Sequence, residues 1–395
     1  MDAQERILRT INHEEPDKVP WFELSIDNLK IVKHFGGKYE LQGLGSALKL
    51  AYNLSFRSNK IMSKMMPKMT YSKTVLKRSV SVVNNLYTNI GIDLAIVPLA
   101  GYYIYFEKKR LIDEYARIFD VIKQSNDNMD FLYYKGGILK NFEDYEAFPP
   151  LDPDNPIRQQ IFKVAQDVQI KNKGKLCFVP AIMGMMEASW EGFGIELFSK
   201  MLTKTKQIQK IFDDRGNFAV ELTKRVIEWG ETGGILVFDD YGYKQGLFMS
   251  PRNYRKFVFP WLKRICSTAH KGGLKVILHC CGDIFQVIED IINAGVDALH
   301  PIEPTTANPE YSIFNLKKLY GDKITFVGNV SPQDLSSMIP DYIRDYSKSL
   351  LKEIAPGGGF IFGSGHSINP AVTLDNFLAM RETLLKYRDY PIKLN

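Results

Sequence analysis

The chain has 395 residues, of which 45% are hydrophobic and 24% charged, and its formal net charge is +6. This length and composition exclude a small binding module and are typical of an enzyme with a large core. The four cysteines form one neighbouring pair and two singletons, which excludes a disulfide framework and favours a reducing compartment. No apolar run approaches the ~20 residues of a membrane span, so we expect a cytoplasmic protein without a membrane partner.

Charge is unevenly distributed along the chain. No acidic residue occurs between Glu40 and Asp93, and this window holds eight basic residues: Lys49, Arg57, Lys60, Lys64, Lys68, Lys73, Lys77 and Arg78. We predict that residues 28–88 form a helical, basic cap, which is either a solvated surface or a contact for an anionic substrate or acidic partner. Few aromatic residues lie among the basic ones, which disfavours a nucleic-acid partner.

The pattern before residue 150 predicts a short helix at 3–11, a first strand at 18–23 and a second strand at 92–98. Between residues 100 and 150 the sequence is rich in aromatic and turn residues, which predicts β-hairpins laid against the rim of a larger sheet. The aromatic residues at 100–135 either line an apolar pocket or belong to an ordinary core.

After residue 150, apolar runs of strand length alternate with helical patterns. The predicted strands lie at 175–180, 234–239, 275–279, 296–301, 323–329 and 359–362. The predicted helices lie at 193–203, 206–229, 251–271, 284–294, 309–320, 332–354 and 372–388. Eight strands, with the later ones each followed by a helix, predict a (β/α)8 TIM barrel of the α/β class.

A doubly wound sheet fits less well, because no glycine-rich phosphate loop follows the first strand. We therefore interpret residues 1–395 as a single barrel domain with an N-terminal helical cap and β-hairpin insertions.

One strand ends in a group of metal-ligating residue types: His279, Cys280 and Cys281. Side chains alternate between the two faces of a strand, so His279 and Cys281 face one site together and Cys280 faces away. An imidazole and a thiolate on one face are two ligands of a zinc site. The alternative is a buried strand that happens to hold these residues, because cysteine is often buried for packing.

Further polar residues follow the other strands, and active sites of such barrels lie at the carboxyl ends of their strands. His366 follows the last strand, 85 residues after Cys281, and barrel curvature can bring it to the same pocket. His279, Cys281 and His366 would then form a three-ligand zinc site with an open fourth position. Asp240 and Glu303 are candidates for a fourth ligand or a general acid. The remaining residues at strand ends are candidates for substrate binding: Trp21, Glu23, Tyr241 and Asn329. We interpret His300 as a buried core histidine, and the alternative for His366 is a capping or loop histidine.

Several motifs together resemble the uroporphyrinogen decarboxylase superfamily, especially the branch that transfers methyl groups to or from corrinoid proteins. The motifs are the opening from Glu5 to Pro20, Ser250-Pro-Arg-Asn-Tyr254, His279-Cys-Cys-Gly282, Pro301-Ile-Glu-Pro304, Gly328-Asn329 and Gly357 to His366. The resemblance implies a (β/α)8 barrel, a zinc ion held by an H-x-C-G motif, and a corrinoid (cobalamin) carried by a partner protein.

Two departures from the superfamily matter. The decarboxylases carry N-terminal arginines that handle porphyrin carboxylates, whereas residues 19–27 hold no arginine, so porphyrinogen decarboxylation is disfavoured. The thiol-methylating members place a second cysteine where His366 stands. One thiolate and two imidazoles leave a zinc ion at a formal charge of +1. This makes it a stronger Lewis acid than a zinc ion with two thiolates and one imidazole, which is formally neutral.

We therefore expect a zinc-dependent methyltransferase that moves a methyl group from a small O-methyl substrate to the Co(I) corrinoid of a partner protein. Glu303 or Asp240 would assist by proton transfer, and the basic segment 49–78 would flank the docking surface. The alternative is methyl delivery from a methylated corrinoid protein to a thiol or another acceptor, and a uroporphyrinogen decarboxylase is less favoured still.

Overall fold

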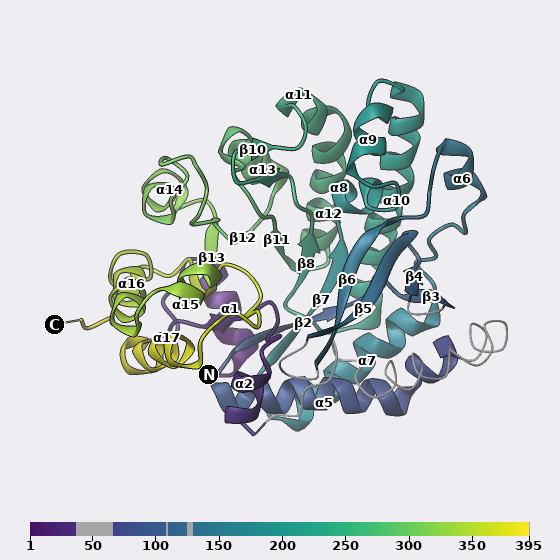
Figure 1. The fold of residues 1–395 in the computed structure, drawn as a ribbon. Helices are drawn as coiled ribbons and strands as arrows, with labels where there is room; N and C mark the ends of the chain where they lie inside the picture. Colours follow the sequence, from purple (N-terminus) through teal and green to yellow (C-terminus); the bar gives the residue numbers. More distant parts are fainter. Residues whose placement is uncertain (37–65, 108–109, 125–128, 395) are drawn as a thin grey trace.

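The computed structural model describes residues 1–36, 66–107, 110–124 and 129–394 (Figure 1). Eight parallel strands form a closed barrel in the order β1-β14-β13-β12-β11-β8-β7-β2. Their bounds are β1 Trp21–Phe22, β2 Leu94–Pro98, β7 Cys177–Met183, β8 Gly234–Phe238, β11 Lys275–His279, β12 Ala298–His300, β13 Thr325–Val330 and β14 Phe360–Ser364. Each overlaps one of the predicted strands, and the predicted (β/α)8 class is confirmed.

Helices lie between the strands and cover the outside of the barrel (Figure 1). Before β8 they are α1 Ala3–Ile11, α2 Leu29–His34, α5 Lys73–Ile90, α6 Phe142–Ala147, α7 Pro156–Lys171, α8 Met185–Trp190, α9 Ile195–Met201 and α10 Thr205–Trp229. After β8 they are α11 Pro251–Asn253, a π-helix Tyr254–Val258, α12 Phe259–Lys271, a 3-10 helix Phe285–Val287, α13 Ile288–Ala294, α14 Ile313–Tyr320, α15 Pro332–Ser337, α16 Pro340–Glu353 and α17 Leu374–Tyr387. None of the helices in the described residues is long and apolar enough to cross a membrane.

Three of the differences between the predicted and the observed helices have a local cause. The helix expected from residue 309 begins at Ile313, because the Ser312 side chain caps it by accepting a hydrogen bond from the Asn315 N–H. The helix expected at 332–354 is two helices, because the residue before Pro340 is extended rather than helical. Helix α7 was not predicted, although Asn155 at its N-cap and Pro156 at its first position are typical start signals.

The predicted β-hairpins are present as an antiparallel sheet between β2 and α6. Its strands are β3 Tyr103–Glu107, β4 Arg110–Asp113, β5 Arg117–Gln124 and β6 Met129–Gly137, in that order. A two-stranded hairpin, β9 Gly242–Tyr243 with β10 Gly246–Leu247, follows β8. Within the predicted cap at 28–88, α2 and α5 are helical, whereas Lys49, Arg57, Lys60 and Lys64 lie outside the described residues.

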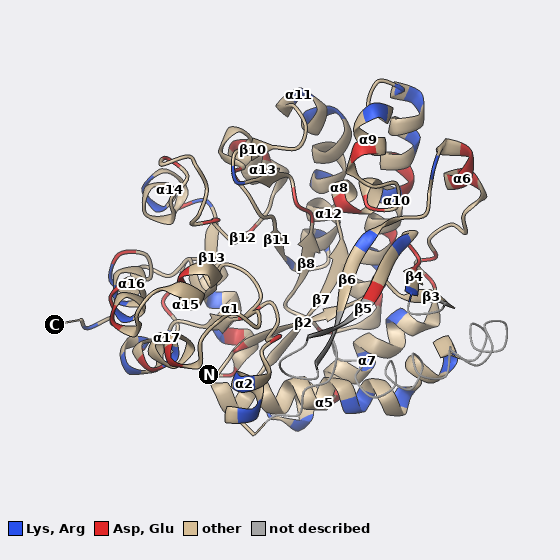
Figure 2. Cartoon of the chain, in the orientation of Figure 1, with Lys and Arg blue, Asp and Glu red and all other residues tan. Residues whose placement is uncertain are grey.

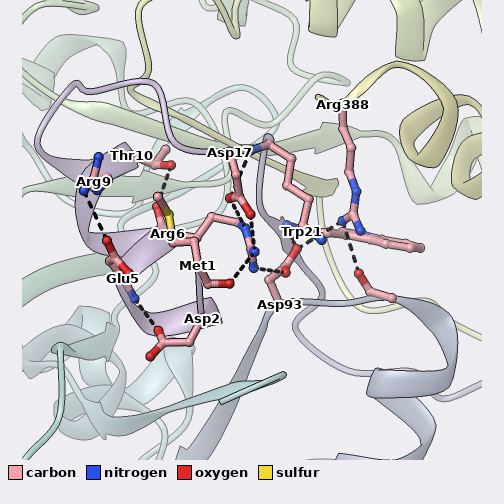
Figure 3. Close-up of polar contacts among 12 residues, drawn as sticks. Met1, Asp2, Glu5, Arg6, Arg9, Thr10, Asp17, Trp21, Asp93 and Arg388 are labelled. Atoms are coloured by element: carbon pink, nitrogen blue, oxygen red, sulfur yellow. Dashed lines mark hydrogen bonds and ion pairs between the residues drawn. The ribbon is translucent and has the colours of Figure 1, made fainter. Parts of the chain in front are cut away.

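Helix α1 seals the barrel at the amino-terminal ends of its strands. Its Ala3, Ile7 and Ile11 join inward-facing residues of the barrel strands in one buried apolar cluster. On the same helix, the Arg6 guanidinium lies 2.7 Å from Asp17 and 2.8 Å from Asp93 (Figure 3). Arg388, which follows α17, also binds Asp93 at 3.2 Å. These contacts tie the helix to the start of β2 and to the last helix.

Substitution of Arg6 by alanine should lower the free energy of unfolding by about 2–4 kcal/mol, because it leaves the buried Asp93 carboxylate with fewer partners. The control is Arg9→Ala, since the Arg9–Glu5 pair is half-exposed and should contribute about 0.5 kcal/mol or less. Urea denaturation followed by circular dichroism measures both variants. Equal midpoints for the two variants would contradict the assigned role of Arg6.

Candidate metal centre

The structure brings the three predicted metal ligands together. His279 ends β11, Cys281 follows two residues later, and His366 lies in the loop after β14. One ligand atom from each lies within 4.8 Å of the others, and Cys281 Sγ is 3.5 Å from His279 Nε2. Ligand atoms of a tetrahedral zinc ion lie roughly 3.5 Å apart. The arrangement therefore fits a single zinc ion, with small movements of His366.

The neighbouring thiols lie on opposite sides of the chain. Cys281 is half-buried beside His279, whereas Cys280 is fully buried in the core that packs the helices against the barrel. The Tyr241 backbone N–H donates a hydrogen bond to Cys280 Sγ at 3.3 Å. Cys280 is thus placed for packing rather than for metal binding, as the alternation of side chains requires.

His300 controls which nitrogen of His279 is free. Its Nε2 lies 3.3 Å from the Ser364 carbonyl oxygen, and its Nδ1 lies 2.8 Å from Nδ1 of His279. Burial lowers the pKa of His300, and burial lowers the pKa of His279 to about 3, so each ring carries one proton. A carbonyl only accepts, so the His300 proton is on Nε2 and His279 donates from its Nδ1. The lone pair on His279 Nε2 then faces Cys281, as a metal ligand requires.

The sequence interpretation of His300 as a buried core histidine did not foresee this role. A signal was nevertheless present: His279 and His300 each end a strand, and the two strands are neighbours. The two residues are register partners across β11 and β12. Partners in a parallel sheet point to the same face, so two histidines in this position are placed to contact each other.

Trp21 and Glu23, predicted as substrate-binding residues, are fully buried beneath the loop that carries His366. Glu23 accepts hydrogen bonds from Trp21 Nε1 at 2.7 Å and from the Ser364 N–H at 3.1 Å. The Ser364 hydroxyl contacts both the Glu23 carboxyl and the His366 carbonyl oxygen. In this position Glu23 fixes the backbone from which the His366 side chain extends.

Two carboxylates predicted to act in catalysis lie near the ligands. Asp240 Oδ1 is 3.9 Å from His279 Nε2 and accepts the Cys281 N–H at 2.7 Å. Burial raises the pKa of Asp240. Glu303 accepts a hydrogen bond from the Thr305 hydroxyl at 2.6 Å. Burial raises the pKa of the Cys281 thiol, and the negative charges of Asp240 and Glu303 raise it further. Both carboxylates therefore lie close enough to the Cys281 thiol to affect its ionisation.

A third carboxylate was missed because its short helix, α8, was not predicted. Glu187 lies in the first turn of α8, and the N–H of Glu187 donates to the buried Asp239 at 3.0 Å. Burial raises the pKa of Glu187, and so does the charge of Asp240. Glu187 therefore belongs to the acidic group beside the metal ligands.

The remaining two substrate-binding candidates, Tyr241 and Asn329, are buried in the protein. Tyr241 is fully buried, and its ring packs against Tyr254 and Phe259, with centroids 5.2 Å and 5.8 Å away. Asn329 is buried on β13, and its Oδ1 has no hydrogen-bond partner among the described residues. The ring contacts of Tyr241 place it in the core between the barrel and its helices.

A cavity of about 520 Å³ opens beside the centre. Residues after β1, residues of β2, helix α5 and the antiparallel sheet form its walls. Arg117, on β5, lies in the wall and is paired with Asp113 at 2.6 Å and with Glu191 at 2.8 Å. Its positive charge is therefore compensated by two carboxylates.

Stability should depend on pH through Glu23. Burial raises the pKa of Glu23 to about 7 from an ordinary value of 4.5, against the opposing effect of its hydrogen bonds. The folded protein therefore holds the proton more tightly than the unfolded chain, and stability falls as the pH rises between these two values. Glu23→Gln, which cannot ionise, should have a shallower slope in urea denaturation over this window. Asp239, whose pKa burial raises to about 7, supplies part of the remaining slope.

The control for Glu23→Gln is Glu5→Gln on the exposed side of α1, which should keep the slope of the unmodified protein. Superimposable pH profiles for Glu23→Gln and the unmodified protein would show that Glu23 is ionised in the fold.

Replacement of His300 by phenylalanine should weaken zinc binding about 10- to 100-fold, because His279 loses the partner that fixes its proton on Nδ1. Competition with a chromophoric zinc chelator measures the affinity, and near-ultraviolet circular dichroism checks the fold. His34→Phe, at an exposed histidine, is the matched control and should bind zinc normally. Undiminished zinc affinity in folded His300→Phe would refute the Ser364–His300 relay, the chain of hydrogen bonds from the Ser364 carbonyl through His300 to His279.

The family model described as uroporphyrinogen decarboxylase (URO-D) matches residues 180–387. The uroporphyrinogen decarboxylase of Pseudoalteromonas translucida is 24% identical over 266 residues, which are 62% of this chain and 70% of that protein. The enzyme of the same name from Coxiella burnetii is 29% identical over 156 residues, which are 39% of this chain and 40% of that protein. The match thus spans less than half the length of the Coxiella relative.

Among solved structures, a methyltransferase from Methanosarcina mazei superposes with a TM-score of 0.64 and 16% sequence identity. The superposition covers 98% of this chain and 99% of the other. The two proteins therefore share the fold along nearly their whole length.

Proposed function

This chain belongs to the uroporphyrinogen decarboxylase family, and we propose that within the family it is a zinc-dependent methyltransferase. It transfers a methyl group from a small O-methyl substrate to the Co(I) corrinoid of a partner protein. The observation that carries the proposal is the convergence of His279, Cys281 and His366 at the carboxyl end of the barrel. The fold shared with the Methanosarcina protein agrees with it.

The donor set favours demethylation of an oxygen. Zinc bound by one thiolate and two imidazoles keeps a formal charge of +1 and supplies Lewis acidity to the oxygen that bears the methyl group. The Ser364–His300 relay keeps His279 Nε2 unprotonated and aimed at the site. The Glu23–Ser364 contacts hold the backbone of the His366 loop in place.

A proton donor is needed at the leaving oxygen. Co(I) brings the electron pair of the new Co–C bond, so the substrate oxygen keeps the pair of the broken C–O bond and takes up a proton. We propose Asp240 as this donor, and its distance of 3.9 Å from His279 Nε2 and its pKa, which burial raises, support the choice. Glu187 and Glu303 are further carboxyls in the same group. The overall reaction converts a methyl ether, a Co(I) corrinoid and a proton into an alcohol and a methyl-Co(III) corrinoid.

Decarboxylation of uroporphyrinogen is the second candidate, because the relatives compared above carry that name. Its substrate presents several carboxylates, which require cationic partners in the site. Residues 19–27 hold no arginine, and the one arginine in the described wall of the cavity is already paired with two carboxylates. These features favour methyl transfer.

The partner should dock at the carboxyl end of the barrel, where the methyl group is exchanged. Lys and Arg positions recur along α5 and just before it, on one side of the molecule (Figure 2). Lys68, Lys73 and Lys77 are exposed there, while the basic residues before residue 66 lie outside the described part of the chain. We propose that these lysines attract an acidic face of the corrinoid protein.

A methyl-transfer assay tests the proposal. The protein, loaded with zinc, is mixed with a Co(I) corrinoid protein and a methoxy compound, and loss of the Co(I) absorbance is followed. Cys281→Ser should lose zinc and slow the reaction by about a thousandfold or more. Cys280→Ser, the matched control one residue away, should retain one zinc per chain and the rate. Turnover of uroporphyrinogen by the metal-free protein, with no methyl transfer to cobalt, would overturn the proposal.

A further inference from the structure

The cavity beside the metal centre has the position of a substrate pocket. Phe238 lines it and packs edge-on against the His279 ring, with centroids 5.3 Å apart. Ser367 also lines it and directly follows His366. A molecule in the cavity can thus place one end at the metal ligands and its body between β2 and α5. The volume of the cavity, about 520 Å³, is within the usual range for small-molecule sites.

Aromatic side chains line the cavity on several sides. They come from the segment before α5, from α5, from the antiparallel sheet and the residue before it, and from the barrel strands: Tyr71, Tyr87, Tyr102, Tyr103, Phe119, Phe178 and Phe238. Most of the remaining wall is aliphatic, including Val83 and Leu86 of α5. Aromatic walls bind a flat ring through stacked and edge-on contacts.

The charges in the described wall are already compensated or shielded. Arg117 is paired with Asp113 and Glu191. Asp27 accepts a hydrogen bond from the Ser25 hydroxyl at 2.6 Å. An ionised carboxylate on the ligand would therefore lose its hydration without gaining a free cation in this wall. The lining favours a ligand without charge.

Two buried hydroxyls in the described wall, those of Ser79 and Tyr102, have no hydrogen-bond partner. The Ser79 side chain is buried, lines the cavity, and its Oγ makes no hydrogen bond with any described residue. Ser79 lies on the same face of α5 as Leu76 and Val83, which also line the cavity at helical spacing. A buried hydroxyl without a partner is unfavourable, so a ligand that supplies an oxygen there gains a hydrogen bond.

We propose that this cavity binds the body of the methylated substrate, and that this body is an uncharged aromatic ring with an oxygen substituent that hydrogen-bonds Ser79. That the bound molecule is a substrate depends on the proposed methyl transfer. That the cavity binds an uncharged aromatic molecule depends only on the lining of the cavity.

The test is direct binding of three probes to the 395-residue protein, by titration calorimetry, in zinc-loaded and metal-stripped forms. The probes are 3-methoxyphenol, 3-methoxybenzoate and methanol. We expect 3-methoxyphenol to bind at least tenfold more tightly than the other two, and to bind the metal-stripped protein as well. Equal affinity for the phenol and the benzoate would overturn the proposal.

Two variants locate the site. Val83→Trp should fill the cavity and abolish binding of 3-methoxyphenol, with the fold checked by circular dichroism and zinc content. Ser79→Ala should weaken binding about two- to tenfold, because one hydrogen bond is lost. Ser81→Ala on the same helix is the matched control, since the Ser81 hydroxyl bonds the Lys77 carbonyl and lies outside the cavity wall. Unchanged binding in folded Val83→Trp would also overturn the proposal.

Failure of this inference can be distinguished from failure of the proposed function. Methyl transfer from methanol without binding of the phenol would overturn the pocket assignment and leave the methyltransferase intact. Binding of the phenol that Val83→Trp abolishes, without any methyl transfer to cobalt, would support the aromatic pocket and refute the methyltransferase.

Discussion

Ser364, the last residue of β14, is the residue whose contacts fix the geometry of the candidate metal centre. Its N–H and hydroxyl bind Glu23, its carbonyl accepts from His300, and its hydroxyl reaches the His366 carbonyl. One residue thereby links β1, β12 and the loop after β14. Because these groups are buried, each contact acts in a region of low dielectric, where an unmade hydrogen bond is costly. Both imidazoles of the centre are held through this residue.

The barrel could be predicted from the sequence because its strands are short apolar runs separated by helical patterns. The pairing of His279 with Cys281, and the exclusion of Cys280, followed from the alternation of side chains in a strand. That His366 would join them followed only from the rule that functional residues gather at the carboxyl ends of barrel strands. The closed strand order supplies the physical reason, since β11 and β14 are separated by two strands of one curved sheet.

Other parts of the centre could not be predicted, because they depend on contacts between distant segments. The role of His300 requires the register between β11 and β12, which no local pattern contains. Glu187 was missed with α8, a helix of six residues that is too short for a periodic signal. Trp21 and Glu23 were placed at the correct strand end, but whether such side chains face the site or support it depends on packing. The structure places both beneath the His366 loop.

The family match and the cavity involve different parts of the chain. The match covers residues 180–387, which include all three metal ligands. Most of the cavity wall comes instead from residues 24–119. The candidate metal ligands therefore lie within the matched region, whereas most of the cavity wall lies before it. The placement of the four cysteines also determines how Cys281 responds to oxidation. The Cys280 thiol lies on the opposite side of the chain from that of Cys281, and Cys177 and Cys266 are buried elsewhere. A metal-free Cys281 attacked by peroxide therefore has no internal thiol to resolve its sulfenic acid, and only an external reductant can restore it.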